Sequence, residues 1–373
     1  MRPITLLAFA FLCVFPSRGF AQCQVFNITS NEIFTTVKAA VNRASTGDTL
    51  VVGNCTFQET GIVIDGSRDL RLIGFPGEST LDGGGRNQTI LTVTGDARVT
   101  IEGITFTNGV GPTTTGSDGG AVNVRNRGYA LIGNCVFEAN STSDHQIGAV
   151  VVRSDSTTRI ENSIFRNNLG RSNANSTAVA SLFRSRLTMV NCLITGSTDG
   201  SSSVYAQTDS RLEVINCTFA DNNTFFDIRA GDNSRLDLSN SVFERRSSRA
   251  FFMFQDSIET TANNVISGAA APDISAFPRF VDAASGDYRL AADSAGIDAA
   301  NARLYTGPVL DLLGNDRLVD DPAVTSLLAG KLDCGAFERV PDTCGTADLA
   351  APFGVLDLDD IDTFIQSFQA GCP

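Results

Sequence analysis

Asn134-Cys135-Val136-Phe137 is the first of five similar phrases that recur along the chain. The later copies are Asn162-Ser163-Ile164-Phe165, Asn191-Cys192-Leu193-Ile194, Asn216-Cys217-Thr218-Phe219 and Asn240-Ser241-Val242-Phe243. Counted between their fourth residues, the copies are 28, 29, 25 and 24 residues apart. A period of this size is typical of a solenoid, in which each repeat buries its apolar face on its neighbours. Residues 131–243 therefore predict a fold built from stacked coils.

Apolar residues alternate within each repeat, as Leu212 and Val214 do before Asn216, and the alternation resumes in the other phase at Cys217 and Phe219. A period of two indicates a strand, and the change of phase indicates a corner. Asparagine suits this corner because it tolerates the left-handed backbone region, and stacked asparagines can bond along the axis. We predict an all-β, single-stranded parallel β-helix with coils roughly 4.8 Å apart. The internal stack should contain Phe106, Phe137, Phe165, Phe219 and Phe243.

Residues 1–21 have the pattern of a secretory signal: Arg2, an apolar core over residues 4–15, and a small residue at Ala21. Cleavage between Ala21 and Gln22 is expected. The apolar core is too short for a membrane span, and no other stretch is long enough. The mature protein should be secreted, whether extracellular, at the cell surface or periplasmic, where disulfides persist.

Residues 31–44 predict the one N-terminal helix, capped by Asn31, with Ile33, Val37 and Val41 on one face. It should cover the open first coil and hide its unpaired edge. Cys23 and Cys55 flank this helix and are expected to form a disulfide that fastens it to the first strands.

Several segments of the first coils carry a family resemblance. They are Thr36-Val37-Lys38-Ala39-Ala40-Val41, Gly47-Asp48-Thr49-Leu50-Val51-Val52, Leu72-Ile73-Gly74, Leu81-Asp82-Gly83-Gly84-Gly85 and Ile101-Glu102-Gly103-Ile104-Thr105-Phe106. Together they resemble the opening of pectin-lyase-like right-handed parallel β-helix proteins. Gly119-Gly120-Ala121-Val122, with the repeated phrase, is similar to the repeats of polymorphic outer-membrane adhesins. The resemblance covers roughly residues 31–290 and implies a right-handed coil, although that fold hosts many activities. With its N-terminal cap, the coil domain is expected to span residues 22–290.

The composition changes after residue 290. The segments are Ser294-Ala295-Gly296-Ile297-Asp298-Ala299, Asp311-Leu312-Leu313-Gly314-Asn315-Asp316-Arg317 and Asp333-Cys334-Gly335-Ala336-Phe337-Glu338. They resemble the C-terminal region of bacterial surface proteins called choice-of-anchor Q. We therefore expect residues 291–340 to form a C-terminal cap of the coil.

Residues 341–373 look like half of a dockerin, an acidic loop followed by a helix that contains Phe364-Ile365-Gln366-Ser367-Phe368. A calcium loop of this kind places oxygen ligands at positions 1, 3, 5, 9 and 12 with Gly at 6. Counted from Asp348, however, Ala350 and Pro352 occupy ligand positions. We expect a vestigial calcium loop of Asp348, Asp357 and Asp360, no cofactor, and a disulfide between Cys344 and Cys372 in place of the ion. The resemblance implies attachment to a surface-anchoring partner.

The remaining cysteines are expected to be buried thiols. Cys135, Cys192 and Cys217 take the repeat position that Ser163 and Ser241 fill elsewhere, and Cys334 takes an apolar position. There is no close cysteine pair of the kind that binds zinc, so no metal site is predicted.

The formal net charge of −13 makes nucleic acid an improbable partner, because an acidic chain is repelled by phosphates. Arginines recur near strand starts and could form an outward ladder that binds acidic glycans; the alternative is a solvated face of ordinary surface ion pairs. The arginines are Arg153, Arg159, Arg184, Arg211 and Arg235, and the acids that could pair with them are Asp155, Glu161, Asp209 and Asp237. We expect a monomer.

Parallel β-helix enzymes that act on acidic polysaccharide need a base and a cation for elimination, or paired carboxylates for hydrolysis. His145 is the single histidine and follows Asp144 in a polar segment. Asp144, His145 and Arg153 are therefore the catalytic candidates, with an ordinary solvated loop as the alternative reading.

Two functions from different classes remain. The absence of family catalytic motifs and the attachment-like C-terminal regions favour a non-catalytic, adhesin-like, structural or glycan-binding protein. The alternative is a carbohydrate-active enzyme, a lyase that cleaves acidic polysaccharide by β-elimination.

Overall fold

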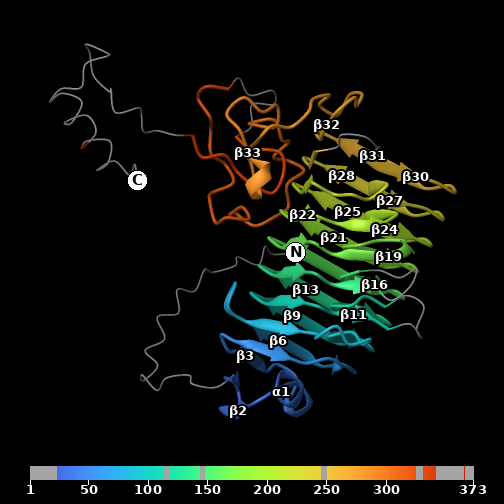
Figure 1. Cartoon of the computed structure of the whole chain (residues 1–373), viewed down its shortest axis with the longest axis vertical. Coiled ribbons are helices and arrows are strands. Elements are labelled where there is room, and N and C mark those ends of the chain that lie inside the picture. Colours follow the sequence, from blue (N-terminus) through green and yellow to red (C-terminus); the bar gives the residue numbers. More distant parts are fainter. Residues whose placement is uncertain are drawn as a thin grey trace.

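The computed structural model describes residues 23–112, 118–142, 148–244, 250–324 and 331–341, together with Ile365. In these residues the chain winds into a parallel β-helix, and successive coils form one stack (Figure 1). The predicted signal segment, with Ala21 and Gln22, lies outside the described residues, as do Asp144 and His145. The predicted tail residues Cys344, Asp348, Asp357, Asp360 and Cys372 also lie outside them.

Three long sheets form the faces of the stack, and all their pairings along the coils are parallel. The eleven-stranded sheet A contains, in order, β2 (Glu32–Phe34), β1 (Val25–Asn27), β3 (Thr49–Val52), β6 (Asp69–Ile73), β9 (Arg98–Glu102), β13 (Tyr129–Gly133), β17 (Thr157–Glu161), β21 (Arg186–Val190), β25 (Arg211–Ile215), β28 (Arg235–Ser239) and β31 (Ile258–Ala262). The nine-stranded sheet B contains β4 (Thr56–Gln58), β7 (Thr80–Asp82), β10 (Thr105–Thr107), β14 (Val136–Glu138), β18 (Ile164–Arg166), β22 (Leu193–Thr195), β26 (Thr218–Ala220), β29 (Val242–Phe243) and β32 (Val265–Ile266).

The eight-stranded sheet C is the third face. It contains β5 (Ile62–Ile64), β8 (Leu91–Thr94), β12 (Val122–Arg125), β16 (Val150–Arg153), β20 (Val179–Leu182), β24 (Ser202–Gln207), β27 (Phe226–Ala230) and β30 (Phe251–Met253). A short sheet D joins sheet B to sheet C in the middle coils through β11 (Val110–Gly111), β15 (Ser141–Thr142), β19 (Leu169–Ala174) and β23 (Thr198–Gly200). One coil therefore runs from sheet C through A and B to D, as β12, β13, β14 and β15 do.

The predicted phenylalanine stack is confirmed on the inner side of sheet B. The rings of Phe106 and Phe137 lie 5.2 Å apart, those of Phe137 and Phe165 4.7 Å apart, and those of Phe219 and Phe243 4.7 Å apart. Ile194 pairs between Phe165 and Phe219 and continues the column. All are fully buried, so each coil places an apolar side chain on the one before it.

The predicted asparagine corner between sheets A and B is also confirmed. Asn134, Asn162, Asn191, Asn216 and Asn240 all have left-handed backbones, with φ between 44° and 53°. The Nδ2 atom of Asn191 donates to Oδ1 of Asn162, and Nδ2 of Asn240 donates to Oδ1 of Asn216, each at 3.1 Å. The corner is therefore held along the axis by side-chain amides.

A second ladder of left-handed residues forms the corner between sheets C and A. Its side chains alternate in charge along the axis. Arg127 donates to Asp96, Arg184 donates to Asp155, and Asn233 donates to Asp209. These bonds join neighbouring coils at the surface, where solvent screens each pair.

The N-terminal cap differs from the prediction. Helix α1 spans Val37–Arg43 and is capped by Thr36, whose side chain accepts from the amide of Ala39; Asn31 is not its cap. Ile33 lies on β2, which with β1 forms an antiparallel extension that covers the edge of β3. The edge thus gains main-chain hydrogen bonds that a helix could not supply, and α1 packs only its apolar side, Val37, Ala40 and Val41, on the first coil.

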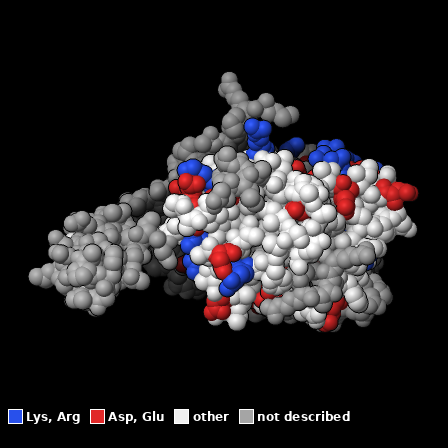
Figure 2. Space-filling view, turned by 90° about the horizontal axis from the view of Figure 1, so that it is seen from above, with Lys and Arg blue, Asp and Glu red and all other residues white. Residues whose placement is uncertain are grey.

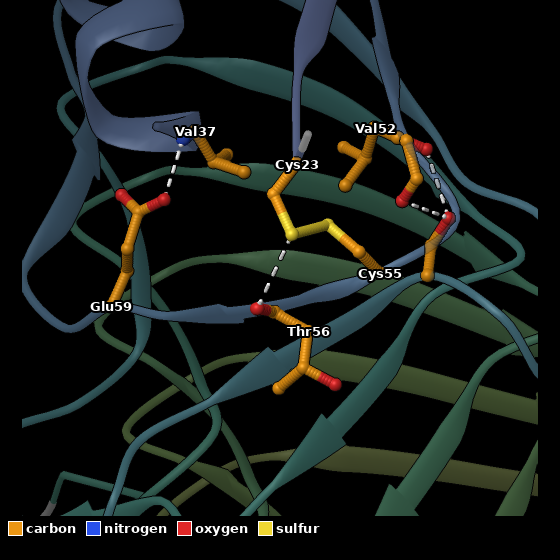
Figure 3. The surroundings of a disulfide bond; sticks show 8 residues. Cys23, Val37, Val52, Cys55, Thr56 and Glu59 are labelled. Carbon is orange, nitrogen blue, oxygen red and sulfur yellow. Dashed lines mark hydrogen bonds between the residues drawn. A yellow bond between two sulfur atoms is a disulfide. The ribbon is translucent and has the colours of Figure 1, made fainter. Parts of the chain in front are cut away.

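The predicted disulfide between Cys23 and Cys55 is present (Figure 3). It joins the start of the described chain to the segment just before β4. Close by, the Glu59 carboxylate accepts from the amides of Val37 and Lys38 at 2.6 and 2.8 Å. The acid satisfies two free N–H groups at the helix start, where negative charge is favoured.

Polar residues end the stack at the last coil. Glu259 and Thr261 of β31 pair with Leu236 and Leu238, so they stand at positions that are apolar in the preceding coil. Figure 2 views the molecule from this end and shows a mainly uncharged surface with charged side chains toward its edges. An acid at an inward position of an edge strand opposes further pairing.

The described part of residues 291–341 lies beside the coils (Figure 1). The sequence had predicted a cap on the C-terminal end of the coil. The antiparallel strands β33 (Phe280–Asp282) and β34 (Asp287–Leu290), joined through the 3-10 turn η1 (Ala283–Ser285), lead into it. Asn191 donates to the Tyr305 hydroxyl, Asn216 to the Asp333 carbonyl and Asn240 to the Asn301 carbonyl, at 2.7, 2.7 and 3.1 Å. We call these described residues the flanking region.

Cys135, Cys192, Cys217 and Cys334 are free and buried, as predicted. Burial raises the pKa of the Cys135 thiol to about 12, which disfavours its reactive thiolate form. Within the described ranges, no helix has the length and apolar character needed to cross a membrane.

Candidate functional site

Arg153, the one predicted catalytic residue that the structure describes, lies at the end of β16 on the outer side of sheet C. Its Nη2 atom donates to Asp118 Oδ1 at 2.6 Å, and Arg125 of the preceding coil lies 3.5 Å from Asp118 Oδ2. The Asp118 side chain is almost fully buried between them. A carboxylate held by two guanidinium groups neutralises buried positive charge, which is a structural role.

This arrangement does not suit Arg153 as a base for β-elimination. A base must accept a proton from the substrate, whereas the Arg153 guanidinium has only donor groups and donates to Asp118. The proposed partners Asp144 and His145 fall outside the described residues, so the catalytic trio stays a prediction.

The predicted arginine ladder is divided among three places. Arg211 and Arg235 pair in register on sheet A, and Arg186 continues their row. Arg159 lies two residues further along its strand and donates to Glu161 and to the Thr306 carbonyl. Arg184 belongs to the charged corner, and Arg153 to sheet C. Because Arg211 and Arg235 both contact Asp237, the alternative of ordinary ion pairs describes this face.

A different cluster on the outer side of sheet C combines aromatic rings with an arginine. The guanidinium of Arg229 on β27 lies 4.8 Å from the ring centroid of Tyr205 and 5.1 Å from that of Phe254. The rings of Phe226 and Phe252 stack at 4.8 Å, and those of Phe252 and Phe254 lie 6.0 Å apart. We call Tyr205, Phe226, Arg229, Phe252 and Phe254 the aromatic–arginine cluster.

Arg229 is half-buried and takes part in none of the ion pairs found among the described residues, and its Nε atom has no hydrogen-bond partner there. Its charge rests against two ring faces, an arrangement worth roughly 0.5–2 kcal/mol. Burial raises the pKa of Tyr205, and the nearby Arg229 charge offsets part of that rise.

Gly231 makes room for this cluster. A Cβ atom at this position would lie 2.0 Å from the Phe254 ring, a separation that forces the ring to move. The ring packs directly over the main chain after β27, which places its face against Arg229. Any larger residue at 231 would disturb the site without changing its charge.

This cluster was not predicted from the sequence because its members are far apart in the chain. The signal lies in the register of sheet C, where one outward row reads Val151, Ala180, Tyr205, Arg229 and Phe252. The row changes from small apolar side chains to large aromatic and charged ones only in the last coils. In each coil a strand of sheet C comes before the strand of sheet A that ends at the asparagine corner. Aligning these sheet C strands with one another would have revealed the row.

Acids of the flanking region form a buried network around Arg317. Arg317 donates to the carbonyls of Asp333 and Gly335 at 3.0 and 3.1 Å and lies 3.5 Å from the Glu338 carboxylate. Asp311 accepts from the amides of Leu313, Asn315 and Glu338. These acids cap loops and bind Arg317, so the segments quoted for the choice-of-anchor resemblance have structural roles here.

No group of three or more His, Cys, Asp or Glu residues in the described ranges is placed to hold a metal ion. The vestigial calcium loop predicted at Asp348, Asp357 and Asp360 lies in the tail beyond residue 341 and stays a prediction.

Comparison with known proteins concerns the fold. The family described as "Right handed beta helix region" matches residues 120–279, and the coil is a right-handed parallel β-helix. Among solved structures, one titled "Crystal structure of pectate lyase Pel9A" is similar, with 13% identity, a TM-score of 0.33, and coverage of 82% of this chain and 91% of that chain. A search of curated proteins found no match.

Proposed function

We propose that this chain is a secreted, non-catalytic protein that binds acidic polysaccharide through the aromatic–arginine cluster. The observation that carries the proposal is Arg229, which is stacked between Tyr205 and Phe254 and makes no ion pair with the described residues. A guanidinium can bind a uronate carboxylate with two parallel hydrogen bonds. The half-buried rings of Phe226 and Phe252 offer apolar surface to the C–H groups of sugar rings.

The cluster suits an extended polymer better than a small molecule. Its side chains come from consecutive coils, so their spacing along the axis follows the spacing of strands. A polysaccharide lying along the last coils of sheet C would meet Phe252 and Arg229 in turn, while the buried Tyr205 supports the Arg229 guanidinium from below. An anionic ligand also fits Arg229, because this arginine makes no ion pair with a carboxylate of the described residues.

Binding should be measured by calorimetry with oligogalacturonate and alginate oligomers, and with a neutral cello-oligosaccharide as the uncharged comparison. We expect Arg229→Gln to weaken binding of the acidic glycans by about 10-fold or more, because a charged hydrogen bond contributes about 1.5–3 kcal/mol. Arg184→Gln is the matched control, since that arginine lies at the charged corner between sheets C and A and is paired with Asp155. Equal affinities of wild type and Arg229→Gln would refute the site.

Turnover separates this proposal from the lyase alternative. Incubation with pectate, alginate or chondroitin should leave the ultraviolet absorbance of unsaturated uronates unchanged. Growth of that absorbance, abolished by His145→Ala, would replace binding with β-elimination as the function.

Secretion is supported by the signal-like pattern of residues 1–21. N-terminal sequencing of protein recovered from the medium or periplasm should begin at Gln22. Attachment through residues 341–373 is part of the same proposal, and a pull-down with that segment should recover a surface partner.

A further inference from the structure

The stack of coils is continued over only one of its three faces at the C-terminal end. Over sheet B, Ile274 pairs in parallel with Val265, and the amide of Ile266 donates to the Ile274 carbonyl at 3.0 Å. Strands β30 and β31, in contrast, are the last strands of sheets C and A, and no strand in the described part of the chain follows them. Each therefore presents an edge at which a further strand could pair.

The core is open to solvent at the same end. Inward side chains of the coil before the last are buried, but those that stack on them in the last coil are not. The buried ones are Ile228, Ala230, Leu236 and Leu238. Their partners in the last coil are Phe251, Met253, Glu259 and Thr261. Glu259 is exposed and the other three are half-buried, so the last coil lacks the cover that it gives to the coil before it.

An acid stands at this open end of the core. Glu259 occupies an inward position of β31 and takes part in no ion pair among the described residues. Burial, and then the charge of Asp273, raise the pKa of Glu259. A strand that pairs with β31 covers this carboxylate, and a covered charge is stable only beside a charge of opposite sign. The side chain laid on Glu259 must therefore be basic.

We propose that the open end binds an extended segment of another protein, with a lysine or arginine opposite Glu259 and apolar side chains opposite Phe251 and Met253. Main-chain hydrogen bonds to β30 and β31 supply the affinity, and the charge pair at Glu259 supplies the specificity. A second copy of this chain is excluded as the occupant. Pairing through its own β31 brings the same acid to the interface, and its N-terminal coil edge is already covered by β1 and β2.

A peptide that repeats residues 250–265 with Glu259→Lys tests this charge rule, because it copies the last strands of sheets C and A. Fluorescence anisotropy of the labelled peptide measures its affinity for the full-length protein. The wild type should bind the Glu259→Lys peptide about 10-fold or more tightly than the unchanged peptide, since like charges at an interface are disfavoured. The Glu259→Lys variant of the protein should reverse this preference. General attraction of a basic peptide to an acidic protein cannot produce that reversal.

Thr260→Lys is the matched control, because it adds a positive charge to the outward side of the same strand and should keep the wild-type preference. Hydrogen exchange followed by mass spectrometry locates the contact: the Glu259→Lys peptide should slow exchange in β30 and β31 of the wild type and leave β9 unchanged. Failure of the wild type to bind this peptide would overturn the proposal without reference to any variant. So would an unchanged preference in the Glu259→Lys protein, or protection only outside β30 and β31.

Discussion

Asn216 and Arg317 donate hydrogen bonds to the same two carbonyl oxygens. Asn216 Nδ2 lies 2.7 Å from the oxygen of Asp333 and 3.5 Å from that of Gly335, and Arg317 Nη2 lies 3.0 and 3.1 Å from the same atoms. One donor belongs to a coil of the β-helix and the other to the flanking region. The segment 333–335 is therefore clamped from both sides, and the asparagine corner is where the flanking region is fixed.

The first prediction follows from this clamp. Asn216→Gly should lower the free energy of unfolding by about 1–3 kcal/mol, because buried carbonyls lose a donor. Asn134→Gly is the matched control: Asn134 has the same left-handed backbone, but it is exposed. Since glycine accepts this backbone freely, the control should change stability by less than about 0.5 kcal/mol. Urea midpoints measure both, and equal losses would show that the corner backbone, not the clamp, matters.

Stability should fall as the pH rises, because of the buried acids around Arg317. Burial is the largest cause that raises the pKa of Asp333 from 3.8 to about 7 and that of Glu338 from 4.5 to about 9, with Arg317 opposing both rises. Folding therefore holds these protons more tightly than the unfolded chain does. The stabilisation is fully present below the unfolded values and is lost as the pH rises through the folded ones.

Urea midpoints between pH 5 and pH 9 test this sign. The wild type should lose on the order of 1 kcal/mol or more across that range. Glu338→Gln should be about as stable as the wild type at pH 5, because its neutral amide replaces the protonated acid, and its pH slope should be shallower. A slope equal to that of the wild type would contradict the assignment to Glu338.

Phe183 is predicted to be a strained position. It has a left-handed backbone with φ of 53° at the corner after β20, where the neighbouring coils place Ser154 and Thr208. A bulky residue pays roughly 1–2 kcal/mol in this region, whereas asparagine tolerates it. Phe183→Asn should therefore raise the thermal midpoint by a few degrees. A lower midpoint would mean that the ring makes a contact that outweighs the strain.

Glu259 should keep copies of the protein from stacking end to end. It stands in an inward position of the last strand of sheet A, and burial, helped by the charge of Asp273, raises its pKa. Glu259→Leu should create self-association that sedimentation velocity detects as dimers at micromolar concentration. Thr260→Leu, on the outward side of the same strand, is the control and should stay monomeric. Association of both variants would indicate non-specific hydrophobic association instead of end-to-end stacking.

Local sequence determined the coil itself. The asparagine phrase, the alternation on either side of it and a large apolar residue at its fourth position recur from coil to coil, so each repeat reports the same environment. The buried thiols Cys135 and Cys192 and the disulfide between Cys23 and Cys55 followed from the same reasoning. The helix start was wrong because pairing of β1 and β2 on the open edge outweighed the local preference of residues 31–36 for helix.

Only the tertiary structure decided where the flanking region packs and which outward side chains meet. Asn216 and Asp333 are 117 residues apart, and Tyr205, Arg229 and Phe252 belong to three different coils. A local pattern records whether a side chain faces inward or outward, but it does not record the register between coils of unequal length. Register is set by the stack as a whole, because each strand finds its place through main-chain bonds to the strand before it.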